Sequence, residues 1–159
     1  MHWGALGTTI ALALLTMASL ALATETSRAE YTAAVEPICK TNTQANEKIL
    51  KGVRQEVKQG KLVLAGSKFS KAAAALDKAY TQLKAVPQPA ADAAKLAKWL
   101  GYVKTEASLF GEAAKALKAG NKSKAQTIVV KLTHNANLAN NQVLSFGFRY
   151  CKLEPSRFT

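Results

Sequence analysis

The side chains with the most distinctive chemistry are amides, and most of them lie near the end of the chain. A helix expected over Ser123–Tyr150 carries a run of amides between residues 135 and 142, although asparagine is a poor helix former. Two more asparagines lie four residues apart on the first expected helix, along its apolar stripe. We call this set the amide cluster; its members are Asn42, Asn46, Asn135, Asn137, Asn140, Asn141 and Gln142.

Two interpretations of the amide cluster follow from its chemistry. In the first, amides on facing helices form a polar pocket that hydrogen-bonds a small ligand, because helical bundles build sites from facing side chains. In the second, the amides bond to one another between helices and fix their register, as a buried asparagine does in a coiled coil. The sequence leaves both interpretations open.

Residues that could perform catalysis are scarce. His134 lies next to the amide run, and the nearest acidic residues in the sequence are Glu112 and Glu154. We recognise no Ser-His-Asp arrangement, no carboxylate pair and no glycine-rich phosphate loop. The sequence also lacks Cys-x-x-Cys and a second ligand pair at metal spacing. It therefore predicts a protein that is not an enzyme, with no cofactor and no metal site.

The chain has two cysteines, Cys39 near the start of the first expected helix and Cys151 just after the last. An even pair in an exported protein predicts a disulfide. The bridge would close a loop that covers most of the chain, which is the arrangement that constrains the unfolded state most.

Charge is strongly one-sided, with 22 Lys and Arg residues against 10 Asp and Glu. The net charge of +12 lies entirely after residue 23, so the body of the protein is attracted to polyanions. A lysine-rich but merely solvated helical surface explains the same composition. Nucleic acid is disfavoured as a partner, because the aromatic side chains that stack on bases make up only 7% of residues. The candidate contacts near expected helix ends and turns are Lys58, Lys61, Lys68, Lys71, Lys115, Lys118, Lys122 and Lys124.

The first 23 residues have the pattern of an export signal. Residues 10–23 form an apolar core, and Ala21-Leu22-Ala23 matches a small-x-small cleavage site. The start lacks the usual Lys or Arg, and the uncharged run is long enough to cross a bilayer as an uncleaved anchor. In either case the basic body is expected outside the cytoplasmic membrane, in the periplasm, the envelope or the medium.

The rest of the chain is expected to be all-α. Apolar residues recur at alternating steps of four and three, the pattern of a helix with one buried face. After a lead-in over 24–36, proline and glycine positions divide residues 37–159 into four helices. The expected helices cover 37–59, 67–85, 89–119 and 123–150.

Four helices with short connections predict an up-down-up-down four-helix bundle behind the signal segment. The first and last helices are expected to be antiparallel neighbours, which brings the two cysteines together. At 1.5 Å per residue, this register places Asn46 level with Leu144 and Val53 level with Asn137.

Two stretches carry a resemblance: VEPICKTNTQANEKILKGVR at 35–54 and LTHNANLANNQVLSFGFRYC at 132–151. They resemble small, exported, Ala/Lys-rich helical-bundle proteins of bacteria with no known activity. The resemblance implies export and a bundle, and it assigns no functional residue.

Together these patterns predict an exported, non-enzymatic helical bundle that associates electrostatically with anionic envelope polymers or a lipid surface. The alternative is a bundle that binds a small ligand through its amide cluster. The sequence predicts neither the ligand nor the oligomeric state.

Overall fold

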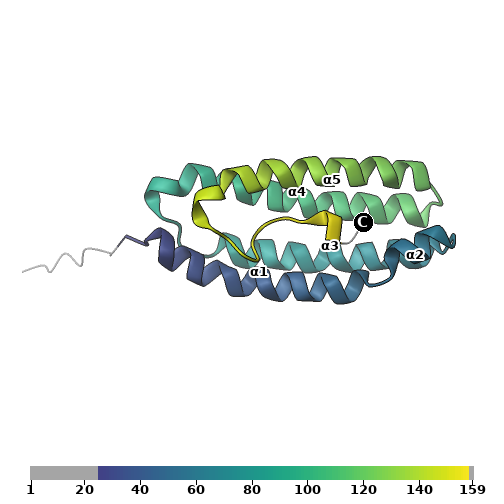
Figure 1. Cartoon of the computed structure of the whole chain (residues 1–159), viewed down its shortest axis with the longest axis horizontal. Helices are drawn as coiled ribbons and strands as arrows, with labels where there is room; N and C mark the ends of the chain where they lie inside the picture. Colours follow the sequence, from purple (N-terminus) through teal and green to yellow (C-terminus); the bar gives the residue numbers. More distant parts are fainter. Residues whose placement is uncertain (1–24, 158–159) are drawn as a thin grey trace, which may run out of the picture.

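The computed structural model describes residues 25–157, and four long helices lie side by side in it (Figure 1). They are α1 Arg28–Leu50, α3 Leu62–Lys84, α4 Ala93–Lys118 and α5 Lys122–Gln142. α3 packs against α1 and α4, and α4 packs against α5. Residues 25–157 contain no strand, so the prediction of an all-helical fold with four packed helices is confirmed.

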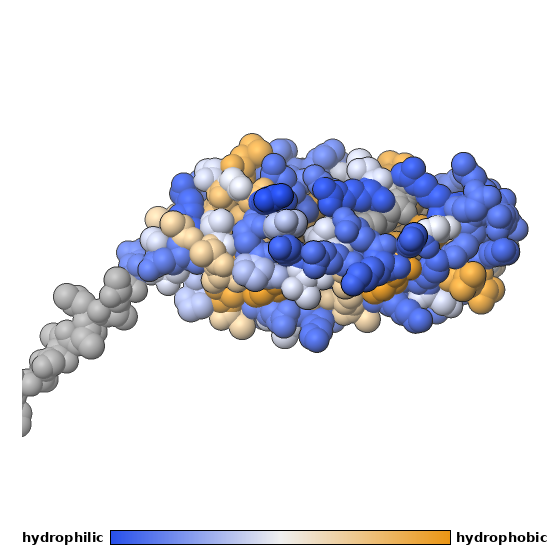
Figure 2. Space-filling view, turned by 60° about the horizontal axis from the view of Figure 1, so that its bottom comes forward, coloured by the Kyte–Doolittle hydropathy of each residue, from blue (hydrophilic) through white to orange (hydrophobic). Residues whose placement is uncertain are grey.

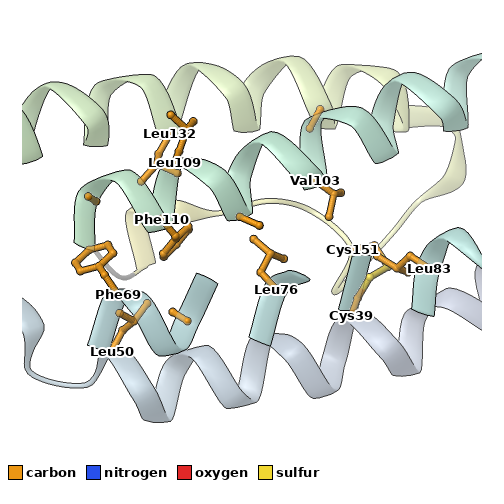
Figure 3. Close-up of a cluster of buried hydrophobic side chains, with 14 of the residues drawn as sticks. Cys39, Leu50, Phe69, Leu76, Leu83, Val103, Leu109, Phe110, Leu132 and Cys151 are labelled. Carbon is orange, nitrogen blue, oxygen red and sulfur yellow. A yellow bond between two sulfur atoms is a disulfide. The ribbon is translucent and has the colours of Figure 1, made fainter. Parts of the chain in front are cut away.

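The buried core follows the apolar stripes of the sequence. Leu132, Ala136 and Ala139 of α5 are buried, as the stripe of the last helix predicts. Between α1, α3 and α4, the Phe69 and Phe110 rings lie with their centroids 5.5 Å apart. Figure 3 shows these rings pointing toward one another across the space between the helices. Burial of these apolar faces is the main stabilising contribution, at about 25 cal/mol per Å² of apolar surface.

The first helix begins earlier than its sequence pattern predicts. α1 starts at Arg28, because Ser27 and Glu30 form a capping box: Ser27 Oγ accepts the Glu30 N–H at 3.2 Å, and Glu30 Oε2 accepts the Ser27 N–H at 2.8 Å. The expected lead-in is therefore wrong for residues 28–36, which are helical. Pro37 lies inside α1 and not in its first turn.

Three other helix boundaries also differ from those expected from the sequence. Gly52 adopts a left-handed conformation, with φ of 78°, and separates α1 from the short helix α2, Val53–Lys58. The expected single helix over 37–59 is thus two helices. α3 begins at Leu62, so Ser67 is not its cap; the Ser67 hydroxyl donates to the Val63 carbonyl within the helix. A short 3₁₀ turn, η1 Ala90–Asp92, precedes α4.

The largest difference is at the C-terminus. α5 ends at Gln142, with Val143 as its C-cap, so the expected continuation to Tyr150 is wrong. A 3₁₀ turn follows, and Gly147, in a left-handed conformation with φ of 63°, ends that turn. Residues 143–157, which we call the strap, turn back and run between α5 and α1 (Figure 1). The strap contains the short 3₁₀ turns η2 Leu144–Phe146 and η3 Pro155–Arg157. The strap links α1 to α5, whereas the sequence pattern predicted that the first and last helices contact each other directly.

No helix within residues 25–157 has the length and apolar character needed to cross a membrane. The expected signal or anchor segment, residues 1–23, lies outside the described part of the chain.

Candidate functional site

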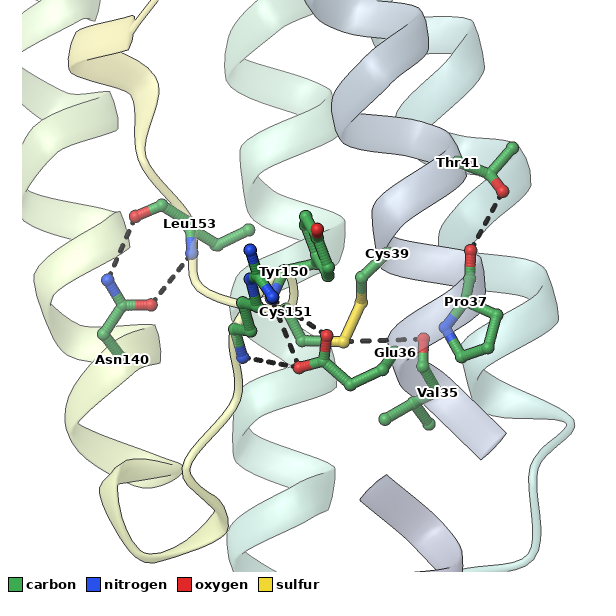
Figure 4. Close-up of a disulfide and its surroundings, with 10 residues drawn as sticks. Val35, Glu36, Pro37, Cys39, Thr41, Asn140, Tyr150, Cys151 and Leu153 are labelled. Carbon is green, nitrogen blue, oxygen red and sulfur yellow. Dashed lines mark hydrogen bonds between the residues drawn. A yellow bond between two sulfur atoms is a disulfide. The ribbon is translucent and has the colours of Figure 1, made fainter. Parts of the chain in front are cut away.

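The predicted disulfide is present and joins α1 to the strap. The Sγ atoms of Cys39 and Cys151 are 2.03 Å apart, and the bridge closes a sequence separation of 112 residues. Both cysteines are buried, and Figure 4 shows the bridge between the α1 ribbon and the strap. The bridge therefore fixes the C-terminal segment against the first helix.

Two side chains hold the strap beside the disulfide (Figure 4). On α1, the Glu36 carboxylate accepts the backbone N–H of Arg149 at 2.6 Å and that of Tyr150 at 3.0 Å. On α5, the Asn140 amide accepts the Leu153 N–H at 2.9 Å and donates to the Leu153 carbonyl at 3.0 Å. Asn140 thus bonds the strap backbone as a neighbouring strand would.

The end of the strap is held by ion pairs. Arg157 lies 3.3 Å from the Glu47 carboxylate and 2.5 Å from that of Glu154. Arg54 donates to the Ser156 carbonyl at 3.0 Å. These exposed contacts are individually weak, at about 0–1 kcal/mol each, but they set the direction of the strap along α1.

Aromatic side chains anchor the start of the strap in the core. The Phe148 ring lies 5.5 Å from that of Trp99, and the Phe146 ring lies 6.0 Å from that of Tyr31. The Arg28 guanidinium lies 5.1 Å from the Phe146 ring centre and donates two 2.8 Å hydrogen bonds to Asp92. The hydrogen bonds from Arg28 hold the pKa of Asp92 below its ordinary value.

A cavity of about 60 Å³ lies beneath the strap. Its walls come from α1, α3 and α4, and the strap supplies the roof. Asn46 and Trp99 line it, and Asn46 Oδ1 and Trp99 Nε1 are buried with no hydrogen-bond partner among the described residues. A buried polar atom without a partner costs about 1–3 kcal/mol, so these two atoms mark the cavity as a place for a polar occupant.

Glu106 of α4 also lines this cavity. It is 3% exposed and accepts a 2.7 Å hydrogen bond from Asn135 Nδ2, which also donates to the Tyr102 carbonyl at 3.0 Å. Burial raises the pKa of Glu106 to about 7, and the hydrogen bond from Asn135 opposes this rise. The sequence interpretation missed Glu106, although its position three residues after Val103 and four before Phe110 places it on the apolar face of α4.

The structure divides the amide cluster among several roles. Asn42 and Asn46 line the cavity, and Asn46 Nδ2 lies 3.5 Å from Asn42 Oδ1. Asn135 holds Glu106 and Asn140 holds the strap. The remaining amides do not line the cavity: Asn137 and Asn141 are exposed and Gln142 is half-buried.

The register expected from direct packing of the first and last helices is therefore wrong. Because α5 ends at Gln142 and the strap turns back, Cys151 is not in line with the α5 axis. Leu144 is exposed, whereas Asn46 lies under the strap. His134 is exposed on α5.

The eight candidate lysines gather at the end of the bundle where α2 and the α4–α5 turn lie, away from the start of the strap. We call this the lysine-rich end. They lie on α2, the α2–α3 connection, the first turns of α3, the last turns of α4 and the first turn of α5. Figure 1 shows α2 and the α4–α5 turn at the same end. α3 and α4 approach closely there, since a Cβ on Gly66 would lie 2.8 Å from the Ala114 carbonyl oxygen.

Most of these lysines are available to a partner. Seven of the eight are exposed, and Lys68 is half-buried. Lys68 Nζ contacts the Glu56 carboxylate at 2.5 Å, and Lys118 Nζ donates to Ser70 Oγ at 2.9 Å. Within residues 25–157, no ion pair involves the other six.

Two large apolar side chains are exposed among these lysines. Val63 is 64% exposed and Leu64 is 49% exposed, both in the first turn of α3. They lie between Lys61 and Lys68 in the sequence. Figure 2 shows hydrophobic surface among the hydrophilic atoms toward this end of the molecule.

Comparison of the chain with protein families, with curated proteins and with solved structures finds no match. No group of three or more His, Cys, Asp or Glu side chains within residues 25–157 is placed to hold a metal ion. Two places thus stand out by their own geometry, the lysine-rich end and the cavity beneath the strap.

Proposed function

We propose that this protein is an exported, non-enzymatic helical bundle that attaches by its lysine-rich end to an anionic surface of the cell envelope. The observation that supports it most is the gathering of eight lysines from separate helices at one end. Charge that is spread over a surface promotes solubility, whereas charge gathered at one place creates a local potential that attracts anions.

The acidic residues do little to neutralise this potential. Two acidic residues, Glu56 of α2 and Glu112 of α4, lie on helix turns next to those of the candidate lysines. Glu56 is already paired with Lys68. Elsewhere, Asp92 pairs with Arg28, and Glu36 is bonded to the strap. The lysine-rich end therefore keeps most of its positive charge for a partner.

The exposed pair Val63 and Leu64 favours a lipid bilayer over a polymer as this surface. Lysines near an anionic bilayer contribute about 1 kcal/mol each. Fully burying a Val or Leu side chain contributes about 1.5–3 kcal/mol, which a bilayer interface supplies and a hydrated polymer does not. The lysines thus provide most of the attraction, and the apolar pair selects lipid.

Export is the second part of the proposal. It rests on the signal-like pattern of residues 1–23 and on the disulfide, since such bonds persist in oxidising compartments outside the cytoplasm. Cleavage after Ala23 and retention as an anchor both place the bundle outside the cytoplasmic membrane.

Sedimentation with lipid vesicles tests the attachment. The chain should bind vesicles that contain anionic lipid at low salt and should detach at about 0.5 M salt, where charges are strongly screened. It should not bind vesicles of neutral lipid. Binding that is unchanged between low and high salt would show that the electrostatic mechanism is wrong.

Two charge-matched variants test whether the location of the lysines matters. The first replaces Lys61, Lys71, Lys115 and Lys122 by glutamine at the lysine-rich end. The control makes the same change at Lys78, Lys84, Lys95 and Lys98, which are exposed on the later turns of α3 and the early turns of α4. The first variant should lose most vesicle binding, and the control should keep it. Equal loss in both would mean that net charge alone governs binding.

A further inference from the structure

We propose that the cavity beneath the strap is a binding site for a small uncharged amide, either free or as the end of a larger molecule. The site is separate from the lysine-rich end and does not depend on the proposed attachment. It differs from the pocket expected from the sequence, because only Asn42 and Asn46 of the amide cluster line it.

Two residues that line this cavity each have a buried polar atom with no hydrogen-bond partner among residues 25–157, and the two atoms are of opposite character. Trp99 is fully buried, and its Nε1–H is a donor; Asn46 is 4% exposed, and its Oδ1 is an acceptor. Buried polar groups in folded proteins are nearly always hydrogen-bonded, to protein or to another molecule. An occupant must therefore offer an acceptor to Trp99 and a donor to Asn46.

Glu106, which lies on α4 as Trp99 does, adds a second hydrogen-bond acceptor to the lining of the cavity. Asn135 holds its Oε2 at 2.7 Å, so the carboxyl group is fixed in position. The helices supply an apolar part of the remaining lining, which includes Leu76, Ala79, Leu83, Val103, Phe110 and the disulfide. Polar and charged residues supply the rest, among them Asn42, Thr43, Arg149, Lys152, Glu154 and Arg157. An occupant that matches this lining combines a polar end with a small apolar end.

Size narrows the choice. A water molecule needs about 10–15 Å³ of such volume, so about 60 Å³ holds roughly four waters or one molecule of about four to five heavy atoms. The smallest amide with an apolar end, acetamide, has this size. Its carbonyl can accept from Trp99 Nε1, its N–H groups can donate to Asn46 Oδ1 and Glu106, and its methyl group can contact the apolar wall.

The hydrogen-bonding groups required by Trp99 and Asn46 argue against the two charged molecules of the same shape. An anion such as acetate cannot donate to Asn46 Oδ1 and would face the Glu106 carboxyl group. A cation such as acetamidinium has no acceptor and would leave the Trp99 Nε1–H unpaired. Of these three molecules of the same shape, only the neutral amide offers both an acceptor for Trp99 Nε1–H and a donor for Asn46 Oδ1.

The test uses the indole N–H signal of Trp99 in ¹H–¹⁵N spectra of the full chain. Trp3 is the only other tryptophan, so a Trp3→Phe background leaves a single indole signal. Titration with acetamide should shift this signal saturably in the millimolar range. Acetate and acetamidinium, which have the same shape, should bind at least tenfold more weakly.

Two outcomes of this titration would overturn the proposal. No saturable shift with acetamide would mean that the cavity holds only water. An equal or stronger response to acetate or acetamidinium would mean that the cavity does not select a neutral amide.

Variants locate the binding to the cavity. Asn46→Leu removes the acceptor, and Ala79→Val adds volume at a wall residue while keeping every polar group; each should weaken acetamide binding at least tenfold. Asn137→Leu changes an exposed amide outside the cavity and should bind as the parent does. If Asn46→Leu does not fold, Ala79→Val decides. Parent-like binding in folded Ala79→Val would contradict the assignment. Vesicle binding should not change in any of these variants, so failure here leaves the proposed attachment unaffected.

Discussion

The strap side and the lysine-rich end of this bundle use charged and polar side chains in opposite ways. On the strap side, Glu36 and Asn140 bond backbone groups, and Arg28 is paired with Asp92. At the lysine-rich end most of the cations have no acidic partner among the described residues, and Val63 and Leu64 are exposed beside them. The polar groups of the strap side thus hold their own chain, and one large apolar side chain of the strap, Leu144, is exposed. The lysine-rich end differs because unpaired cations and two exposed apolar side chains occur together there.

This difference explains how a strongly basic protein can still present one distinct surface. Most of its acidic groups act in caps, ion pairs and strap contacts, as Glu30, Asp92 and Glu36 do. Seven of the eight lysines at the lysine-rich end have no ion pair among the described residues, and they lie close together where the α2–α3 and α4–α5 connections meet, while other unpaired lysines are spread along the helices. The two regions therefore differ in where their cations lie and whether these are paired, and not in the total charge of the protein.

The largest expected effect is loss of the disulfide. Replacing Cys39 and Cys151 by serine opens a loop of 112 residues, and the free energy of unfolding should fall by about 4–5 kcal/mol. Urea unfolding of the variant against the oxidised parent measures this. A fall below about 1 kcal/mol would mean that Glu36, Asn140 and the aromatic contacts hold the strap without the bridge.

The next effect is a dependence of stability on pH that belongs to Glu106. Its pKa is raised from 4.5 to about 7 in the folded protein, so the unfolded chain releases this proton at lower pH. Stability should therefore fall as the pH rises from about 4.5 to 7, by about 3 kcal/mol in total, and should then level off.

Glu106→Gln isolates this contribution, since glutamine does not titrate. The difference in unfolding free energy between parent and variant should change across this pH range and stay constant above about pH 8. A constant difference from pH 5 to 8 would contradict the burial of Glu106 as an acid without a cationic partner.

A smaller effect concerns the close approach of α3 and α4 at the lysine-rich end. Gly66→Ala would place a Cβ 2.8 Å from both the Ala114 carbonyl oxygen and Lys118 Cγ, and should lower stability by about 1–3 kcal/mol. Gly101→Ala is the matched control, because no heavy atom lies within 4 Å of its added Cβ; it should raise stability by up to about 1 kcal/mol. Thermal unfolding of both compares them, and a stabilised Gly66→Ala would show that the helices are less tightly packed there.

Much of the fold could be predicted from local patterns in the sequence. Apolar steps of four and three identify buried faces such as Leu132 and Ala136, and an even cysteine pair predicts the bridge. The gathering of lysines follows from their positions beside two connections, because antiparallel helices bring alternate connections to the same end. These inferences need only local periodicity and chain direction.

The strap and the cavity could not be predicted in the same way. The apolar stripe of the last helix continues through Phe146 to Tyr150, and these side chains are needed in the core whether the backbone is helical or not. The helix ends at Gln142, five residues before Gly147, and glycine also occurs inside helices, as Gly101 and Gly111 do here, so Gly147 does not mark the helix end in the sequence. Without the strap, neither the position of Asn46 nor the cavity beside Glu106 follows.

Quenching of tryptophan fluorescence by brominated lipids tests directly whether the lysine-rich end is the part of the protein that contacts the membrane. Leu64→Trp places a reporter at the lysine-rich end, and Leu144→Trp places one at another exposed leucine, in the strap. In a Trp3→Phe background the remaining native tryptophan, Trp99, is fully buried in the core. On anionic vesicles, we expect strong quenching at position 64 and none at position 144. Equal quenching at both positions, or quenching only at 144, would contradict this expectation.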